Sequence, residues 1–338
     1  MKGIRCEQAE KLALVELPEP ACGPGEAIVA VKRIGICGTD LHAYKGNQPF
    51  FDYPRILGHE LSGVIERIDD PASGLRAGDP VSIIPYLHCG RCIACRSGKT
   101  NCCTAMKVLG VHADGGMRER IAVPTSHLLK ASGLTLDEAA VVEPLSIGAH
   151  AVRRSELRAG ETALVIGAGP IGLGVMAFAK QRGARVIAMD LSEQRLVFCS
   201  QWAKVHHTVK ASPEAAAELA SITDGDYPTA VFDATGHAGS MTSAFRYVAH
   251  GGRLVYVGLV KGDIAFNDPE FHKREMTLMG SRNATKEDFL HVMDVVRGGS
   301  LDIGAYVTHR AAFDETVDRF EEWLDPASQV IKAMVEIR

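Results

Sequence analysis

The sequence predicts an α/β protein in which a β-rich, barrel-like domain accompanies a doubly wound parallel-sheet domain. Residues 1–130 contain short apolar runs broken by Gly, Pro and Asp, a pattern typical of small β-barrels. From Thr162 onward, short apolar strands alternate with segments of helical length, which predicts a parallel sheet covered by helices. A chain of 338 residues is long enough to give each domain its own core.

The first part of the chain is expected to form mostly strands. Short apolar runs of strand length occupy residues 27–31, 62–68 and 81–84. A helix is expected over about 135–155, because apolar residues recur there at helical spacing. Pro144 lies inside this segment and is expected to interrupt the helix or to start a turn.

The second part of the chain is expected to alternate between strands and helices. The predicted strands are 163–166, 186–189, 230–232, 253–257 and 276–279. The predicted helices are 170–180 and 192–202, the second with Ser192 as its N-cap. After Gly280 the pattern becomes a mixture of helix and strand that ends in the segment 330–337.

Composition and charge exclude several classes of protein. The chain is 46% hydrophobic and 23% charged, which argues against disorder, and its net charge of −4 does not favour a nucleic-acid partner. The longest uncharged stretch, 163–179, contains several glycines and falls short of the ~20 residues of a membrane span. The N-terminus lacks the apolar region of a signal peptide. We therefore expect a cytoplasmic protein without a nucleic-acid or membrane partner.

A glycine pattern marks a candidate dinucleotide loop. Gly167, Gly169 and Gly172 form GxGxxG, with Pro170 and Ile171 inside it, between a predicted strand and a predicted helix. Glycines at these positions permit a tight turn, a close approach of backbone to pyrophosphate, and close packing of helix on sheet. The alternative is a glycine-rich turn that binds nothing, but the succession of strand, loop and helix favours the nucleotide.

The second strand of this region ends at an acidic residue. Asp190 follows the loop by about 20 residues, where a carboxylate binds the adenine-ribose hydroxyls and repels a 2′-phosphate. This favours NAD over NADP, although Arg195 is a nearby cation of the kind that holds a 2′-phosphate. Later strand ends supply candidate contacts to the nicotinamide half, or are simply sheet-to-loop residues: Thr235, Val257, Gly258 and Leu259.

Five of the nine cysteines are crowded into one polar segment. Four of them could close a tetrahedral structural zinc site: Cys89, Cys92, Cys95 and either Cys103 or the adjacent Cys102. An iron–sulfur cluster of the bacterial ferredoxin type is disfavoured because the fourth cysteine and the following proline are not at the required spacing. A nucleic-acid zinc ribbon is disfavoured by the net negative charge, and buried free thiols by the polar surroundings.

A second group of potential metal ligands is spread over three segments. Cys37 lies in a predicted turn that also contains Thr39, Asp40 and His42, and His59 and Glu60 begin a predicted strand. A thiolate, an imidazole and a carboxylate form the donor set of an open, catalytic zinc site. Asp40 could accept the second ring N–H of His59. A further carboxylate could come from Glu143, at the expected domain junction.

Together these motifs resemble the zinc-dependent medium-chain dehydrogenases/reductases of the alcohol and polyol dehydrogenase type. The resemblance covers essentially the whole chain and rests on CGTD-x-H, GHE-x-x-G, the four-cysteine segment and GAGPIG, in this order. It implies a GroES-like catalytic domain made of residues 1–145 and 283–338, with a structural zinc lobe at 88–104. It also implies a Rossmann NAD-binding domain at 146–282.

The same resemblance implies roles for individual residues. Catalytic zinc is expected on Cys37 and His59, with either Glu60 or Glu143 as a further ligand, and structural zinc on the cysteines with Cys103 as the fourth. Thr39 is expected on the substrate hydroxyl, with His42 relaying the proton to solvent. The implied cofactors are NAD and two zinc ions per chain, and the implied assembly is a homodimer or homotetramer, with residues 276–279 as a candidate edge strand.

Segments outside the general motifs resemble the bacterial L-galactonate oxidoreductase branch of this family: 46–51, 110–116, 268–275 and 280–285. The branch implies hydride transfer from a secondary alcohol of a sugar acid to NAD, with Arg282 as the cation for the substrate carboxylate. Alternatives are a neutral polyol or sugar such as sorbitol, or a threonine-type dehydrogenase. A non-catalytic NAD-binding redox sensor is disfavoured because Cys37, Thr39 and His59 are all present.

Overall fold

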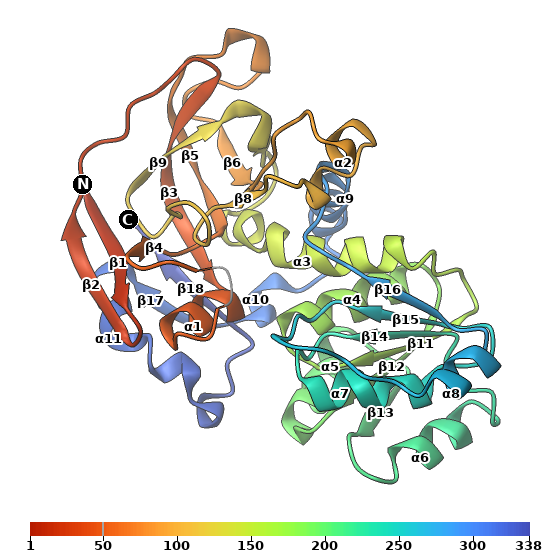
Figure 1. The fold of residues 1–338 in the computed structure, drawn as a ribbon. Coiled ribbons are helices and arrows are strands. Elements are labelled where there is room, and N and C mark those ends of the chain that lie inside the picture. Colours follow the sequence, from red (N-terminus) through yellow and green to blue (C-terminus); the bar gives the residue numbers. More distant parts are fainter. Residues whose placement is uncertain (49–50) are drawn as a thin grey trace. The chain divides into compact units, whose positions relative to one another are not determined.

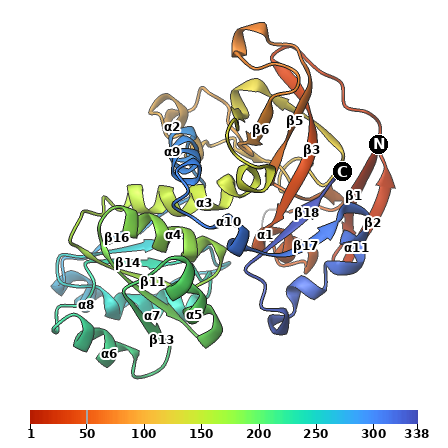
Figure 2. The ribbon, with the colours of Figure 1, turned by 180° about the vertical axis from the view of Figure 1, so that it is seen from behind.

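The computed structural model describes residues 1–48 and 51–338, and the chain divides into two compact units. Unit 1 consists of Met1–Glu143 and Thr285–Arg338, and unit 2 consists of Pro144–Ala284. Both ends of the chain therefore belong to unit 1 (Figures 1 and 2). Pro49 and Phe50, which belong to the segment 46–51, lie outside the described residues.

Unit 1 is built around a sheet of seven strands, in the order β10-β6-β5-β3-β18-β17 with β9 also paired to β3. Their bounds are β3 Glu26–Ile36, β5 Glu60–Ile68, β6 Pro80–Ile83, β9 Arg120–Pro124, β10 Leu128–Lys130, β17 Val307–Ala312 and β18 Lys332–Glu336. Strand β18, from the C-terminal segment, pairs antiparallel with β3, so that Ala333 faces Ile36 (Figure 1). The predicted strands at 27–31, 62–68 and 81–84 all lie in this sheet.

Smaller elements complete unit 1. A three-stranded sheet contains β1 Lys2–Gln8, β2 Lys11–Glu16 and β4 Arg55–Ile56, and an antiparallel pair contains β7 Tyr86–Leu87 and β8 Lys107–Val108. The helices are α1 Gly38–Tyr44, α2 Ile93–Arg96, α9 Lys286–Arg297, α10 Ile303–Tyr306 and α11 Thr316–Arg319. Side chains of alternating strand residues, among them Val29, Val31, Leu61 and Val81, are fully buried and form its core.

Unit 2 is a parallel six-stranded sheet with helices packed on it. Its strands are β11 Thr162–Ile166, β12 Arg185–Asp190, β13 His207–Lys210, β14 Ala230–Asp233, β15 Arg253–Tyr256 and β16 Thr277–Gly280. The order β13-β12-β11-β14-β15-β16 is the 3-2-1-4-5-6 order of dinucleotide-binding sheets. The doubly wound parallel sheet predicted from the sequence is thus confirmed.

The helices of unit 2 connect successive parallel strands. They are α4 Pro170–Gln181, α5 Glu193–Trp202, α6 Ala215–Ile222, α7 Ala238–Ser243 and α8 Asp268–Lys273. The predicted N-cap is confirmed, because the Ser192 hydroxyl accepts a hydrogen bond of 3.3 Å from the Arg195 amide. Short 3-10 turns occur in both units: Pro71–Ser73, Thr100–Cys102, Thr125–His127, Ala244–Tyr247, Phe313–Glu315, Glu322–Leu324 and Pro326–Ser328.

The helix expected near 135–155 is present as α3, Leu136–Arg154, but the expectation for Pro144 is wrong. The helix continues through this proline, at the expense of the backbone hydrogen bond that proline cannot donate. Val141, Val142 and Leu145, which flank it, are fully buried, and their packing offsets the lost bond. Within the described part of the chain, no helix combines the length and the apolar character needed to cross a membrane.

Candidate active site and cofactor loop

The CGTD-x-H segment, predicted as a turn, forms helix α1 instead, with Cys37 as its N-cap. Asp40 explains the difference, because its side chain accepts a 3.0 Å hydrogen bond from the Cys37 amide and caps the first turn. Its other oxygen accepts a 3.1 Å bond from the Gly58 amide. Burial raises the pKa of Asp40, and these two amides act against that rise. Asp40 therefore ties the segment that carries Cys37 to the segment that carries His59.

Cys37, His59 and Glu60 converge in unit 1, with one ligand atom from each within 4.8 Å of the others. The Nδ1 atom of His59 is buried and has no hydrogen-bond partner among residues 1–48 and 51–338. It lies 3.7 Å from Oδ1 of Asp40, too far for the hydrogen bond expected from the sequence. A thiol, an imidazole and a carboxylate that converge in this way fit a zinc ion.

Electrostatics in this cluster are dominated by buried negative charge. Burial works against protonation of His59, but the neighbouring Asp40 and Cys37 outweigh it and raise the pKa of the ring well above its ordinary value. A protonated ring is a poor metal ligand, so an ion that binds here must displace that proton. Metal binding at the cluster is therefore expected to release protons.

The Glu60 carboxylate has a partner that the sequence interpretation missed. Lys332, on β18, donates to both carboxylate oxygens, at 2.6 and 2.7 Å, and both side chains are buried. Gly35 makes room for this pair, since a Cβ at residue 35 would overlap the Glu60 carboxylate. The available signal was a lysine between the apolar residues Ile331 and Ala333, because a lysine at a buried position requires a counter-ion.

Glu143 lies near the cluster but is not one of its three converging donors. Its Oε1 atom accepts a hydrogen bond from the hydroxyl of Tyr86, a second residue that sequence reasoning missed. Burial raises the pKa of Glu143 to about 7, with the charges of His59 and Glu60 acting in opposite directions. The structure thus gives each of the two carboxylates a different buried partner, a lysine for Glu60 and a tyrosine for Glu143.

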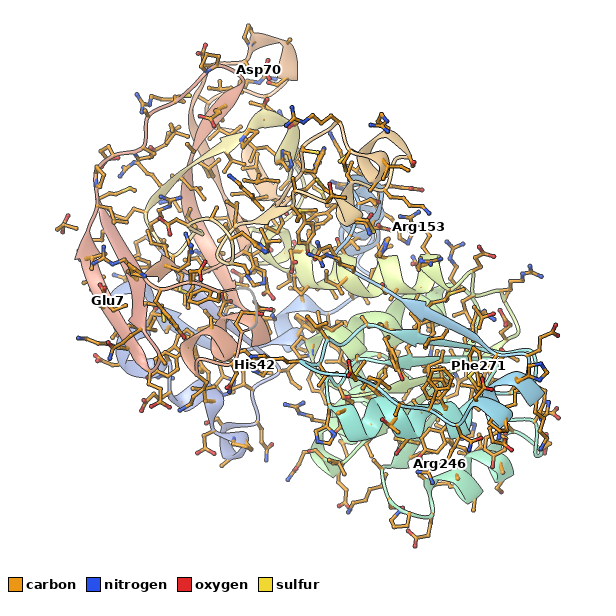
Figure 3. The ribbon with its side chains drawn as sticks, viewed as in Figure 1. Glu7, His42, Asp70, Arg153, Arg246 and Phe271 are labelled. Atoms are coloured by element: carbon orange, nitrogen blue, oxygen red, sulfur yellow. The ribbon has the colours of Figure 1, made fainter. Side chains whose placement is uncertain are left out.

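The two residues expected to move the proton both lie on α1. Thr39, in the first turn of the helix, is half-buried, and His42, one turn later, is exposed. Figure 3 labels His42 on this helix. Both belong to the helix whose N-cap is Cys37, so the cap that positions the thiol also positions them.

Four cysteines form a separate cluster in unit 1: Cys89, Cys92, Cys95 and Cys103 all place their sulfur atoms within 4.8 Å of one another. The amides of Cys89 and Ala105 donate to the Cys103 sulfur at 3.3 and 3.4 Å. Hydrogen bonds from backbone amides lower the pKa of Cys92 to about 5. Amides aimed at sulfur favour thiolates, so this cluster fits a closed zinc site. Cys102 is exposed and is not part of the cluster.

The glycine loop of unit 2 lies between β11 and α4, as predicted. Gly167 has a φ of +95°, which favours glycine, and a Cβ at Gly172 would overlap the Gly167 carbonyl oxygen. Pro170 and Ile171 open the helix, with Gly169 as its N-cap. The Ala168 amide donates a 2.6 Å hydrogen bond to Asp190 at the end of β12. The loop and the acid are therefore directly connected.

Other strand ends gather beside this loop. A Cβ at Gly167 would lie 3.0 Å from Cγ2 of Thr235, and a Cβ at Gly258 would overlap the Gly236 amide. Val257 and Leu259 flank Gly258 after β15. Arg195 reaches toward Gly169, with Nη1 3.7 Å from the place of a Cβ there. Arg282, by contrast, is an exposed residue that follows β16.

Comparison with protein families gives two matches. Residues 23–133 match the alcohol dehydrogenase GroES-like domain, and residues 170–297 match the zinc-binding dehydrogenase family. L-galactonate-5-dehydrogenase of Escherichia coli K12 is 42% identical over 335 residues, which cover 99% of this chain and 98% of the relative. Sorbitol dehydrogenase of Bacillus subtilis is 30% identical and covers 99% of this chain and 97% of its own length.

Solved structures agree with this grouping. A short chain alcohol dehydrogenase from Escherichia coli CFT073, crystallised with NADH, superposes with a TM-score of 0.93 and 29% identity, covering 100% of this chain and 99% of its own. A zinc-binding dehydrogenase from Sinorhizobium meliloti, bound to NADP, superposes with a TM-score of 0.89 at 27% identity, covering 99% of each chain. The chain belongs to the zinc-binding medium-chain dehydrogenases, NAD-dependent oxidoreductases that act on CH–OH groups.

Proposed function

We propose that this protein oxidises a secondary hydroxyl of a sugar acid with NAD, and that L-galactonate or a close relative is its substrate. The observation that carries this proposal is the 42% identity to an L-galactonate-5-dehydrogenase, which spans almost the full length of both chains. A second relative, 2-dehydro-3-deoxy-L-galactonate 5-dehydrogenase of Pseudoalteromonas atlantica, is 31% identical over 92% of each chain. Both relatives are named for sugar-acid substrates.

The metal site of this reaction is the cluster of Cys37, His59 and Glu60, with Glu143 as an additional carboxylate. Its support is the convergence of a thiol, an imidazole and a carboxylate, whose ligand atoms lie within 4.8 Å of one another. When bound, zinc supplies a Lewis acid for the substrate hydroxyl, and NAD supplies the acceptor for the hydride. Asp40 holds the Cys37 and His59 segments together through its two backbone hydrogen bonds.

The proton of the substrate hydroxyl leaves through α1. Thr39 takes part because its hydroxyl both accepts and donates a hydrogen bond. His42 passes the proton to solvent, in keeping with its exposure and with an imidazole ring that accepts a proton on one nitrogen and donates from the other. The four-cysteine cluster holds a second zinc, which stabilises the lobe at 88–104 and takes no part in the chemistry.

NAD rather than NADP is the cofactor of this proposal, and it binds to residues 146–282. Gly167, Gly169, Pro170 and Gly172 receive the pyrophosphate, and Asp190 receives the adenine ribose. The direct hydrogen bond from Ala168 to Asp190 supports this arrangement, because it fixes the carboxylate beside the loop. Residues 1–145 and 283–338 form the catalytic domain.

A neutral polyol is the second candidate substrate. The observation that favours it is the sorbitol dehydrogenase of Bacillus subtilis, which is 30% identical over 99% of this chain. Arg282 distinguishes the two candidates, because only the sugar acid has a carboxylate for its guanidinium to bind.

The test is NADH formation by the zinc-loaded enzyme with L-galactonate, other aldonates, sorbitol, simple alcohols and threonine. L-galactonate or another aldonate should give the highest kcat/KM, and the variant Arg282→Met should raise KM for that acid while leaving KM for sorbitol unchanged. Arg246→Met is the matched control, since Arg246 is exposed on unit 2 and is not in the proposed site (Figure 3). Oxidation of sorbitol alone would reject the sugar acid.

Cys37→Ser tests the metal site in the same assay. The variant should lose nearly all turnover and keep only the zinc of the four-cysteine cluster. Turnover close to that of the wild type would reject Cys37 as a ligand.

The assembly in this proposal is a homodimer or homotetramer formed through β16. This strand ends the order of the unit 2 sheet, and Leu278 on it is 39% exposed. Unpaired edges of this kind favour pairing with a second copy. Light scattering should therefore give a multiple of the 36.3 kDa chain mass, and a monomeric mass would reject the assembly.

A further inference from the structure

Lys332 is a buried cation whose contacts all belong to the neighbourhood of the proposed metal site. Its side chain is 2% exposed, and its ammonium donates to the two oxygens of Glu60 and, at 3.0 Å, to the Ile36 carbonyl. An ammonium has three donors, and these three acceptors use all of them. Strand β18 pairs antiparallel with β3, and Ala333 faces Ile36 in this pairing. The pairing therefore places the backbone of Lys332 beside the end of β3.

The charges of the site explain what such a cation does. Cys37, Asp40, Glu60 and Glu143 carry four negative charges when all are ionised, and the three carboxylates are almost fully buried. A divalent metal balances two of these charges and leaves two. Buried charges without partners are strongly disfavoured, so the remaining carboxylates require a cation or hydrogen-bond donors, and Asp40 has such donors in the amides of Cys37 and Gly58. Lys332 supplies that cation directly on Glu60.

We propose that Lys332 is a positioning residue of the metal site, whose charge balances the Glu60 carboxylate beside Cys37 and His59 and thereby moderates the affinity of the site for metal. This inference rests on the proposed function, since it requires a metal at the cluster. In the metal-free protein, Lys332 is the counter-ion of Glu60. In the metal-loaded protein, it reduces the negative charge that the metal experiences.

Removal of the lysine charge should strengthen metal binding. Lys332→Met keeps a long apolar side chain but leaves Glu60 as an unpaired buried carboxylate, which destabilises the metal-free protein. A bound dication replaces the missing cation, so the metal-loaded protein loses less stability, and affinity rises by linkage. A lysine that served only packing would give the opposite result, because a loosened cluster binds metal more weakly.

The experiment measures metal affinity and ligand geometry directly, without turnover. Chelator competition gives the dissociation constant of the exchangeable zinc, and cobalt substitution gives a visible spectrum that reports the ligands. Lys332→Met should lower the zinc dissociation constant by ~10-fold or more and change the cobalt spectrum. Lys332→Arg should restore the wild-type spectrum. Weaker binding, or an unchanged spectrum and affinity, would overturn the proposal.

A second pair of variants keeps the test decisive if Lys332→Met does not fold. Glu60→Gln leaves the lysine charge without its carboxylate and should weaken zinc binding, and adding Lys332→Met to it should recover part of the loss. No recovery in the double variant would overturn the proposal. Lys2→Met is the matched control, because Lys2 forms an exposed ion pair with Asp314 in the same unit.

Zinc binding by the wild-type protein and by Cys37→Ser distinguishes a failure of the proposed function from a failure of the role proposed for Lys332. If it binds zinc only at the four cysteines, the proposed function itself fails. If it binds an exchangeable zinc that Cys37→Ser removes, while the Lys332 variants behave as the wild type does, only the role of Lys332 fails.

Discussion

The backbone amide of Ala168, in the glycine loop, donates a 2.6 Å hydrogen bond to Oδ2 of Asp190. The other oxygen of Asp190 accepts a 2.8 Å bond from the Ser192 amide. The carboxylate is thus held at the end of β12 and next to the loop. Asp190→Ala should weaken NAD binding by ~10-fold and NADP binding much less, because in the proposed function this carboxylate binds the ribose hydroxyls of NAD and repels the 2′-phosphate of NADP.

Fluorescence titration of both nucleotides measures this change in preference. Asp190→Asn is the control that retains the shape of the side chain and removes its charge, and it should lose discrimination while keeping part of the NAD affinity. An unchanged ratio of the two affinities in both variants would mean that Asp190 does not face the ribose.

The glycines of the loop are expected to respond differently to the same substitution. A Cβ at Gly172 would overlap the carbonyl oxygen of Gly167. This oxygen belongs to the backbone and cannot rotate away as a side chain can, so Gly172→Ala should destabilise unit 2 by about 1–3 kcal/mol or more. Gly169 has only the Arg195 guanidinium near the place of a Cβ, at 3.7 Å. Gly169→Ala should therefore leave stability within about 0.5 kcal/mol of the wild type.

Chemical denaturation gives the stabilities, and NAD titration gives the affinities. Gly169→Ala should still reduce NAD affinity, because a methyl group obstructs the approach of pyrophosphate to the backbone. Equal stability of the two variants would contradict the packing that the structure shows at Gly172.

The adjacent cysteines 102 and 103 provide a test of the four-cysteine cluster. Cys103 is buried and shares the cluster with Cys89, Cys92 and Cys95, and Cys102 is exposed outside it. Cys103→Ser should lower zinc content by about one equivalent per chain and destabilise the lobe, because metal binding stabilises the folded ligand set. Cys102→Ser should change neither quantity. Loss of zinc from both variants would show that the two thiols exchange as ligands.

The fold and the ligand-bearing segments could be predicted from the sequence because each depends on local patterns. Apolar runs of strand length identified the two sheets, and GxGxxG between a strand and a helix located the loop. The turn expected at Cys37 was wrong because Asp40 caps a helix there. In the sequence, an aspartate three residues after Cys37 looks the same whether it caps a helix or forms a turn. Pro144 was expected to break α3, and tertiary burial overrode that local preference.

The partners of the two glutamates could not be predicted, because they depend on pairing between distant parts of the chain. Lys332 reaches Glu60 only because β18 joins the sheet beside β3, a contact across 272 residues. Tyr86 reaches Glu143 across 57 residues. A buried lysine in an apolar strand signals a counter-ion, but no local pattern states which carboxylate supplies it.

Acid stability is expected to depend on Glu161, at the start of the unit 2 sheet. Arg253 donates to both of its oxygens, at 3.0 and 2.8 Å, and the Arg158 amide and the Thr229 hydroxyl donate at 2.7 and 2.9 Å. Burial acts to raise the pKa of Glu161, but these donors prevail and lower it from 4.5 to about 2. The folded protein therefore holds this carboxylate ionised at a pH where the unfolded chain protonates it.

The sign of the pH effect follows from that lowered pKa. Glu161 contributes its full stabilisation above pH 4.5, and the contribution is lost as the pH falls toward about 2. A shift of this size corresponds to about 3 kcal/mol in the free energy of unfolding. Denaturant unfolding of the wild type and Glu161→Gln should show a difference near that size at neutral pH, which shrinks across this acidic range. Zinc loss in acid affects both proteins alike, so a difference that stays constant with pH would show that the carboxylate charge does not stabilise unit 2.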